Sequence, residues 1–91
     1  MADGVANGAA SVRVRYFAGA RAAAGTEQED VPLPDDATVG GLVDELAARH
    51  GPALARVLAA SSFLVDEVVS RRDRALGDGA AVDVLPPFAG G

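Results

Sequence analysis

A single long amphipathic pattern constrains this sequence most, and it begins at Val39. Its apolar residues follow the spacing i, i+3, i+4, i+7 and i+8, which places them on one face of a helix: Val39, Leu42, Val43, Leu46 and Ala47. Thr38, directly before this run, is a candidate N-cap. Gly51-Pro52 stops the pattern, so we predict a helix over residues 39–50.

Two strand patterns precede this helix. Residues 11–17 (SVRVRYF) alternate between apolar and basic side chains, which is typical of a strand with one buried face. Residues 27–33 (EQEDVPL) are expected to return as a second strand, and Pro32 suits a strand end or an edge because it has no N–H to donate. The small, glycine-punctuated segment 19–26 between them is predicted to be a long hairpin loop.

Three further elements are predicted after the helix. Residues 53–60 (ALARVLAA) indicate a short second helix. Residues 63–69 (FLVDEVV) indicate a strand whose acidic pair, Asp66-Glu67, lies at an edge or a bend. A glycine-containing turn at residues 76–79 then leads into the last predicted strand, residues 81–85.

The order of these elements is strand, strand, helix, short helix, strand, strand. This order is compatible with an α+β fold, the β-grasp, in which a mixed sheet wraps on one main helix. If the first and last strands lie side by side, the shared core contains Val12, Val14, Val82 and Val84 against Leu42, Val43 and Leu46.

The size and composition of the chain narrow its function. Its 91 residues suffice for one domain, predicted over residues 11–85, and leave little room for a deep cleft. The sequence has no cysteine, which excludes disulfides, thiolate metal sites and a cysteine nucleophile. A net charge of −5 argues against nucleic-acid and anionic-membrane partners. Residues 1–10 lack the pattern of a secretory signal, so we expect a flexible leader and a cytoplasmic protein.

The sequence beyond the last predicted strand is Pro86-Pro87-Phe88-Ala89-Gly90-Gly91. Two consecutive prolines remove two N–H donors, so the strand cannot continue and the chain leaves it in an extended direction. Six extended residues reach about 20 Å at ~3.3 Å each. Because glycine has no side chain, the carboxylate of Gly91 can pass a narrow channel. We therefore expect residues 86–91 to be a tail that can enter another protein's pocket.

Together these features resemble the MoaD/ThiS family of ubiquitin-like sulfur carriers. The resemblance covers about residues 11–91 and is most specific in the tail, residues 86–91. The other matching residues are 12–18 (VRVRYFA), Arg21, Gly25, Thr38-Val39, Leu42, Leu46, Leu76, Asp78-Gly79 and Val82. The sequence departs from the family pattern at Val65-Asp66-Glu67 and at Gly79-Ala80-Ala81, which bears on the choice of partner more than on the carrier role.

The resemblance implies a function in molybdenum-cofactor biosynthesis. A ubiquitin-activating-type adenylyltransferase would use ATP and magnesium to adenylate the carboxylate of Gly91, which follows Gly90, and a sulfur donor would then displace AMP to leave a thiocarboxylate. The large subunit of molybdopterin synthase would receive the tail, and the sulfur would pass to cyclic pyranopterin monophosphate. On this reading the chain binds no cofactor or metal and is not catalytic alone.

Partner contacts are expected at the tail and beside it. Phe17 has the opposite parity to the buried residues of its strand, and Phe88 follows the prolines where no core remains to receive it. We predict these two aromatics as partner contacts together with Leu85, Pro86, Pro87 and Ala89. The alternative is that Phe17 covers the second face of the sheet and Phe88 folds back on its own domain.

The remaining polar residues indicate no independent chemistry. His50 is expected to serve the end of its helix rather than catalysis, since a cation there favours the helix dipole. Asp35-Asp36 and Asp66-Glu67 lack metal-ligand spacing and are predicted as a turn and an exposed edge.

Three other functions stay open at this point. The chain could carry sulfur to another product, such as thiamine thiazole, cysteine or another thiolated metabolite, although thiazole carriers more often lack a pair like Pro86-Pro87. It could be a ubiquitin-like modifier whose Gly91 forms isopeptide bonds with lysines. It could also be a binding module with an incidental glycine end.

Overall fold

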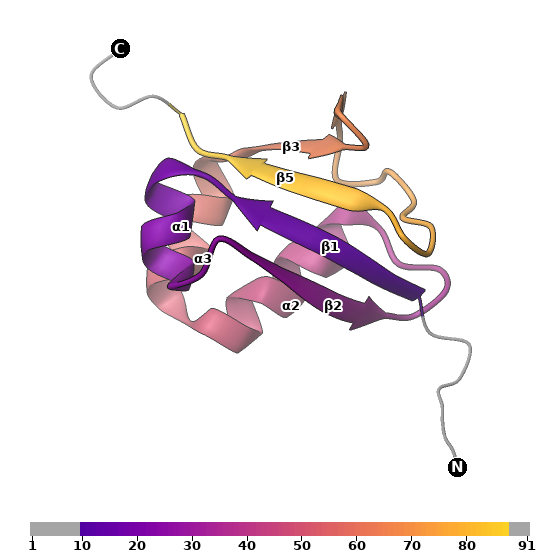
Figure 1. Cartoon of the computed structure of the whole chain (residues 1–91), viewed down its shortest axis with the longest axis horizontal. Helices are drawn as coiled ribbons and strands as arrows, with labels where there is room; N and C mark the ends of the chain where they lie inside the picture. The colour runs from indigo at the N-terminus through magenta and orange to yellow at the C-terminus, as the bar shows by residue number, and fades with distance from the viewer. Residues whose placement is uncertain (1–9, 88–91) are drawn as a thin grey trace.

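The computed structural model of the chain describes residues 10–87, in which three helices pack on a five-stranded sheet (Figure 1). The strands are β1 (Ala10–Tyr16), β2 (Gln28–Leu33), β3 (Ser62–Val65), β4 (Val68–Ser70) and β5 (Ala81–Leu85). The helices are α1 (Ala18–Ala24), α2 (Val39–His50) and α3 (Pro52–Ala60). The predicted α+β class is confirmed, and so is the position of its main helix, α2.

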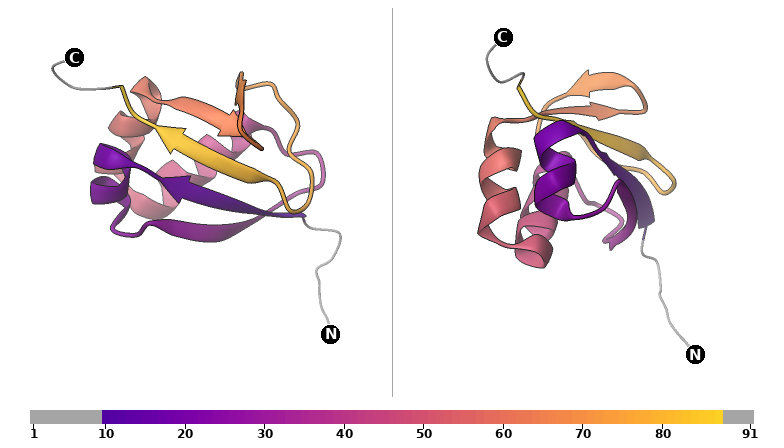
Figure 2. Two further views of the ribbon diagram at one scale, coloured as in Figure 1. Left: turned by 45° about the horizontal axis from the view of Figure 1, so that its top comes forward. Right: turned by 60° about the vertical axis from the view of Figure 1, so that its left-hand side comes forward.

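The sheet has the strand order β2-β1-β5-β3-β4. Strands β1 and β5 are parallel, with Val14 opposite Val82 and Tyr16 opposite Val84, while the other neighbouring pairs are antiparallel. Figure 2 shows these two strands side by side in the middle of the sheet. The predicted pairing of the first and last strands is therefore confirmed, and both strands end at the same edge of the sheet.

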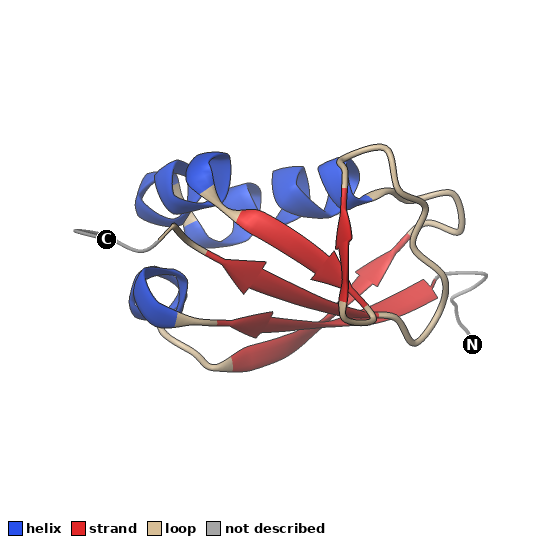
Figure 3. Cartoon of the chain, turned by 90° about the horizontal axis from the view of Figure 1, so that it is seen from above, coloured by secondary structure: helices blue, strands red, loops and turns tan. Residues whose placement is uncertain are grey.

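The core lies between the sheet and the helices, with α2 and α3 on one side of the sheet (Figure 3). The predicted core is confirmed, because at most 6% of the surface of each of its members is exposed: Val12, Val14, Val82, Val84, Leu42, Val43 and Leu46. No helix in residues 10–87 is long and apolar enough to cross a membrane.

The ends of α2 have the predicted local structure. The side chain of Thr38 accepts a 3.2 Å hydrogen bond from the N–H of Gly41, which satisfies one free donor at the start of the helix. Gly51 ends the helix with a φ of 94° and a ψ of −171°, a conformation open essentially to glycine alone. Pro52 begins α3 at a position where its missing N–H costs nothing.

The predicted loop over residues 19–26 is wrong, since this segment forms α1. Its sequence, AGARAAA, is rich in alanine, the strongest helix former, and this outweighs the single Gly19. Ala20 is fully buried in the core, so tertiary packing stabilises the helix further. The helix ends at Gly25, which has a φ of 75° and donates its N–H to the carbonyl of Arg21 at 2.9 Å.

The predicted single strand over residues 63–69 is a hairpin of β3 and β4. Asp66 and Glu67 form its two-residue turn, with φ values of 48° and 73°. Positive φ at both positions matches the twist of the flanking strands, and aspartate tolerates this conformation better than most residues. The side chain of Asp66 also accepts a 3.0 Å hydrogen bond from the N–H of Ala81. The predicted bend was correct, and the continuous strand was not.

The predicted leader meets the domain one residue earlier than expected. Ala10 is buried and is the first residue of β1, where it pairs with Leu33. The rest of the leader lies outside the described residues. The same is true of Phe88, Ala89, Gly90 and Gly91, so the roles predicted for them stay predictions.

Candidate functional site

The candidate site is the edge of the sheet at which β1 and β5 both end. Tyr16 and Val84 are opposite each other in the parallel pair, so the residues that follow them, Phe17 just after β1 and Leu85 at the end of β5, lie at the same edge of the sheet. Phe17 is 37% exposed and lies outside the buried core, as predicted, while Leu85 is half-buried. The strand ends at Leu85, and the half-buried Pro86 and exposed Pro87 follow it.

Backbone geometry sets the direction of Phe17. The next residue, Ala18, has a φ of 50°, which is left-handed and unfavourable for a residue with a Cβ. This conformation turns the chain sharply from β1 into α1, and the N–H of Ala20 binds the carbonyl of Phe17 at 3.0 Å. A short turn thus holds the ring at the edge of the sheet.

The sheet face opposite the helices is called the open face below. Strand alternation places on it the residues that lie between core residues. One row crosses all five strands, since pairing joins each of its members to the next: Gln28, Arg15, Asp83, Leu64 and Val69. The row is polar on β2, β1 and β5 and apolar on β3 and β4. The open face therefore joins a charged half to an apolar half beside the site edge.

Val69 was not among the predicted contact residues, although it is 74% exposed. It belongs to β4, which was predicted to be continuous with β3. Pairing of Val69 with Leu64 places both on the open face. The acidic pair Asp66-Glu67 was the sequence signal for this strand. A two-residue hairpin turn at these positions places Val69 opposite Leu64.

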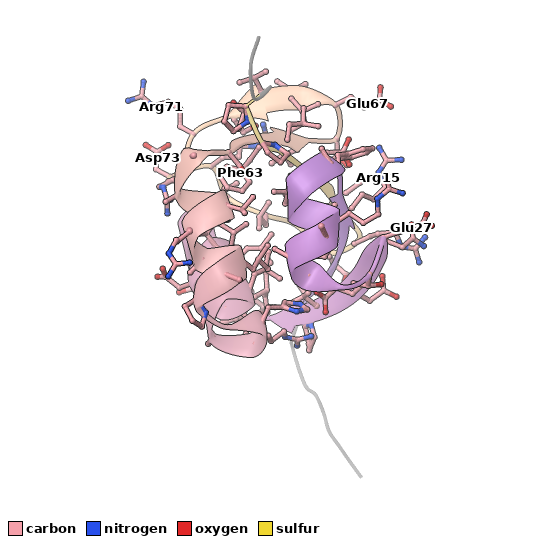
Figure 4. All side chains as sticks on the ribbon, turned by 90° about the vertical axis from the view of Figure 1, so that its left-hand side faces the viewer. Arg15, Glu27, Phe63, Glu67, Arg71 and Asp73 are labelled. Carbon is pink, nitrogen blue, oxygen red and sulfur yellow. The ribbon has the colours of Figure 1, made fainter. Side chains whose placement is uncertain are left out.

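Arg15 and Asp83 form the central ion pair of the open face. Nε and Nη2 of Arg15 donate to the two carboxylate oxygens of Asp83 at 2.7 and 2.8 Å. Asp83 is 6% exposed, and it is the one charged residue buried among residues 10–87. The guanidinium carbon of Arg15 also lies 5.9 Å from the centre of the Phe17 ring, within cation–π range. Figure 4 shows Arg15 directed away from α3.

A second polar cluster joins the other face of β1 to the end of α2. The hydroxyl of Tyr16 donates to Glu29 at 2.6 Å, and Nε2 of His50 lies 2.5 Å from the same carboxylate oxygen. Arg49 donates to the other oxygen at 3.2 Å. Burial tends to raise the pKa of Glu29, but the hydrogen bonds from Tyr16 and His50 and the nearby positive charge outweigh it, so its pKa is lowered.

This cluster corrects the role expected of His50. The residue does end α2, but the partner of its ring is Glu29 on β2 rather than the last carbonyls of the helix. The ring also packs edge-on against Tyr16, with centroids 5.9 Å apart. His50 has this partner because the packing of α2 on the sheet brings the C-terminal end of the helix beside β1 and β2.

The acidic pairs lie where the sequence analysis expected them. Asp35-Asp36 is in a turn before α2, and Asp66-Glu67 is in the exposed turn between β3 and β4. In residues 10–87 no three histidine, aspartate or glutamate side chains come together to hold a metal ion.

The fold and this edge define a ubiquitin-like β-grasp protein whose last strand leads directly into a C-terminal extension. SAMP1 from Haloferax volcanii has a similar structure, with a TM-score of 0.80 and 29% identity over 89% of this chain and 99% of SAMP1. The model of the ThiS family matches residues 14–91, and the chain belongs to that family. The resemblance drawn from the sequence is thereby confirmed.

Two curated relatives match most of the chain. The molybdopterin synthase sulfur carrier subunit of Chlamydomonas reinhardtii is 37% identical over 82 residues, which is 88% of this chain and 98% of the relative. The subunit of the same name from Mycobacterium tuberculosis is 33% identical over 81 residues, covering 88% of this chain and 96% of the relative.

Proposed function

We propose that this protein is the sulfur carrier subunit of a molybdopterin synthase. The observation that carries the proposal is the match, over nearly their whole lengths, with two relatives that bear this name. The sequence of the tail, which ends in Gly90-Gly91 after two prolines, supports it. The reacting group is then the C-terminal carboxylate, and the domain presents it to other proteins.

The chemistry begins with activation of Gly91. Its carboxylate oxygen attacks the α-phosphorus of ATP on an adenylyltransferase that holds magnesium, and pyrophosphate leaves. A carboxylate is a poor electrophile, whereas the resulting acyl adenylate has AMP as a good leaving group. Hydrosulfide supplied by a sulfur donor then attacks the acyl carbon, the bond to AMP breaks and AMP departs, and loss of the S–H proton leaves a thiocarboxylate. The chain itself contributes the reacting carboxyl group and the surface that the enzyme recognises.

Transfer follows on the large subunit of the synthase, in the cytoplasm. The extended tail, including Phe88 and Ala89, enters the large subunit and brings the thiocarboxylate sulfur to cyclic pyranopterin monophosphate. Phe17 and Leu85 lie beside the start of this tail, and Val69 lies on the open face. These three side chains supply apolar contacts for docking. Exposed aromatic and aliphatic side chains of this kind often dominate an interface.

Intact-mass spectrometry tests the proposal. The chain is incubated with the adenylyltransferase, ATP, magnesium and a sulfurtransferase with its sulfur source. We expect a mass change equal to replacement of one oxygen by one sulfur, located in the C-terminal peptide. Adding the large subunit and cyclic pyranopterin monophosphate should then return the mass to that of the free acid. If neither an adenylate nor a thiocarboxylate forms, the carrier role is wrong.

A modifier function is the second candidate, and one observation favours it. The structure of H. volcanii small archaeal modifier protein 1 is similar to this chain, with a TM-score of 0.78 and 28% identity. The same activated Gly91 would then be attacked by lysine amines of target proteins. Covalent conjugates in cell extract that require Gly91 would support this function. If no conjugates form and sulfur is transferred in the assay above, the modifier function is excluded in favour of the carrier function. Transfer of the sulfur to a different acceptor would indicate a carrier for another pathway.

A further inference from the structure

The Arg15–Asp83 pair occupies the centre of the open face, beside two hollows. One hollow, of about 410 Å³, extends from Gln28 on β2 across β1 and β5 to the acidic turn, and Asp83 and Glu67 are among its lining residues. The other, of about 260 Å³, lies toward α1 and includes Phe17 and Arg21. Arg15 and Gln28 line both hollows, so the Arg15 side chain borders each of them.

The pair is connected to both predicted contact residues of the site edge. Arg15 lies over the ring of Phe17, and Asp83 is two residues before Leu85 on β5 and faces the same side of the sheet. A protein that covers Phe17 and Leu85 must therefore also cover Arg15, whose side chain is 43% exposed in the free chain. Docking then removes water from a guanidinium group.

The hydrogen bonds of the pair show what a partner has to supply. Both carboxylate oxygens of Asp83 already accept bonds from Nε and Nη2 of Arg15. Nη1 makes no hydrogen bond to any of residues 10–87 and still has N–H groups to donate. Covering these groups without a new acceptor leaves them unsatisfied, which is unfavourable by an amount comparable to a lost charged hydrogen bond. A carboxylate is the acceptor that binds a guanidinium most strongly.

Resting on the proposed function, we propose that Arg15 is a specificity-determining residue of the large-subunit interface. The large subunit that fits this open face has an apolar patch against Leu64, Val69 and Leu85 and a carboxylate opposite Nη1 of Arg15. Asp83 is the positioning residue, because its two hydrogen bonds hold the guanidinium over Phe17. A surface with an apolar patch alone is rejected, since it would bury the free donors of Arg15.

Exchange of the two residues tests this arrangement. In the double variant Arg15→Asp/Asp83→Arg the cross-strand pair and the net charge are retained, but the guanidinium moves to β5 and a carboxylate faces the large subunit at position 15. Calorimetric titration with the large subunit from the same organism should show binding weaker by at least about tenfold. The binding of the unaltered chain should also weaken with added salt, because it includes a charge pair between proteins.

The exposed pair Arg13–Asp30 offers a matched control. It lies on the same face, with an Nε to Oδ1 distance of 3.1 Å and side chains 55% and 60% exposed. Exchange of these two residues should leave the affinity within about twofold, since exposed pairs contribute little. If both exchanged variants bind as tightly as the unaltered chain, Arg15 does not determine specificity.

If the Arg15→Asp/Asp83→Arg variant does not fold, a single substitution tests the same inference. Arg15→Lys keeps the charge beside Asp83 but loses the two parallel hydrogen bonds and the planar group over Phe17. We expect weaker binding of the large subunit with a melting temperature within a few degrees of the original. Equal affinity would contradict the inference. Thiocarboxylation of Gly91 is measured separately, so failure of this inference can be distinguished from failure of the proposed function. If the unaltered chain does not bind the large subunit, both the inference and the proposed function are wrong.

Discussion

The hydroxyl of Tyr16, on β1, donates a 2.6 Å hydrogen bond to the carboxylate of Glu29, on β2. Tyr16 is 2% exposed, so its ring belongs to the core while its hydroxyl reaches a charged group at the margin of the core. His50 and Arg49 bind the same carboxylate from α2. Together these contacts join β1 and β2 to α2, one residue before Phe17, and so support the edge of the sheet at which β5 ends.

Replacement of Glu29 by glutamine should lower stability in a pH-dependent way. The pKa of Glu29 is lower in the folded chain than its unfolded value of about 4.3, so its charge stabilises the fold above that pH. We expect Glu29→Gln to reduce the free energy of unfolding by roughly 1–3 kcal/mol at pH 7. As the pH falls through the lowered pKa, this difference should disappear. Urea denaturation at several pH values measures it.

Asp30→Asn is the control for this experiment, because Asp30 follows Glu29 on β2 and makes an exposed ion pair with Arg13 on β1. Its effect should stay within about 0.5 kcal/mol. A difference between the unaltered chain and Glu29→Gln that is constant from pH 7 down to acid unfolding would show that the Glu29 charge does not carry the effect.

Substitutions at Leu46 and Val69 should distinguish residues that stabilise the core from residues that bind a partner on the open face. Leu46 is fully buried between α2 and the sheet, so Leu46→Ala should lower the free energy of unfolding by about 2–5 kcal/mol. Val69 is 74% exposed, and Val69→Ala should change it by less than about 0.5 kcal/mol. In titration with the large subunit the Val69 variant should nevertheless bind more weakly. Unchanged binding would remove Val69 from the docking surface.

Two glycines should respond in opposite ways to alanine. Gly51 joins α2 to α3 with a φ of 94°, so Gly51→Ala should destabilise the fold by about 1–3 kcal/mol. Gly19 lies inside α1 with open space around its Cα, and Gly19→Ala should stabilise it by roughly 0.5–1 kcal/mol. Thermal melting followed by circular dichroism compares the two. A stable Gly51 variant would mean that the helix junction adopts another geometry.

Deletion of Gly91 should abolish sulfur transfer without unfolding the domain. Within residues 10–87 the buried core runs from Ala10 to Val84, so we expect a complete core in the shortened chain. The truncated tail is also shorter by about 3.3 Å, which withdraws the carboxylate from its place in a partner. The assay is product formation with the large subunit, alongside the melting temperature. A large fall in melting temperature would assign the tail a structural role instead.

Much of the fold could be predicted because its signals are local. The alternation in β1, the helical spacing in α2 and the stop at Gly51-Pro52 depend only on neighbouring residues, and the structure has each of them where expected. The errors arose where two local signals competed. In α1 glycines suggested a loop, while alanine propensity and burial of Ala20 produced a helix.

The sequence by itself determined the fold class of this protein and pointed to its family. A chain with one amphipathic helix, alternating strands and a proline-led Gly-Gly terminus supports a β-grasp domain with an extended tail, and these are properties of consecutive residues. Only the tertiary structure decided what surrounds that tail. Arg15 and Asp83 are 68 residues apart in sequence, and they become neighbours in the sheet because β1 and β5 pair in one parallel register. The same register brings Phe17, directly after β1, and Leu85, the last residue of β5, to one edge of the sheet. Pairing between distant strands depends on the packed core as a whole, so no local pattern could show that an ion pair lies at the centre of the open face.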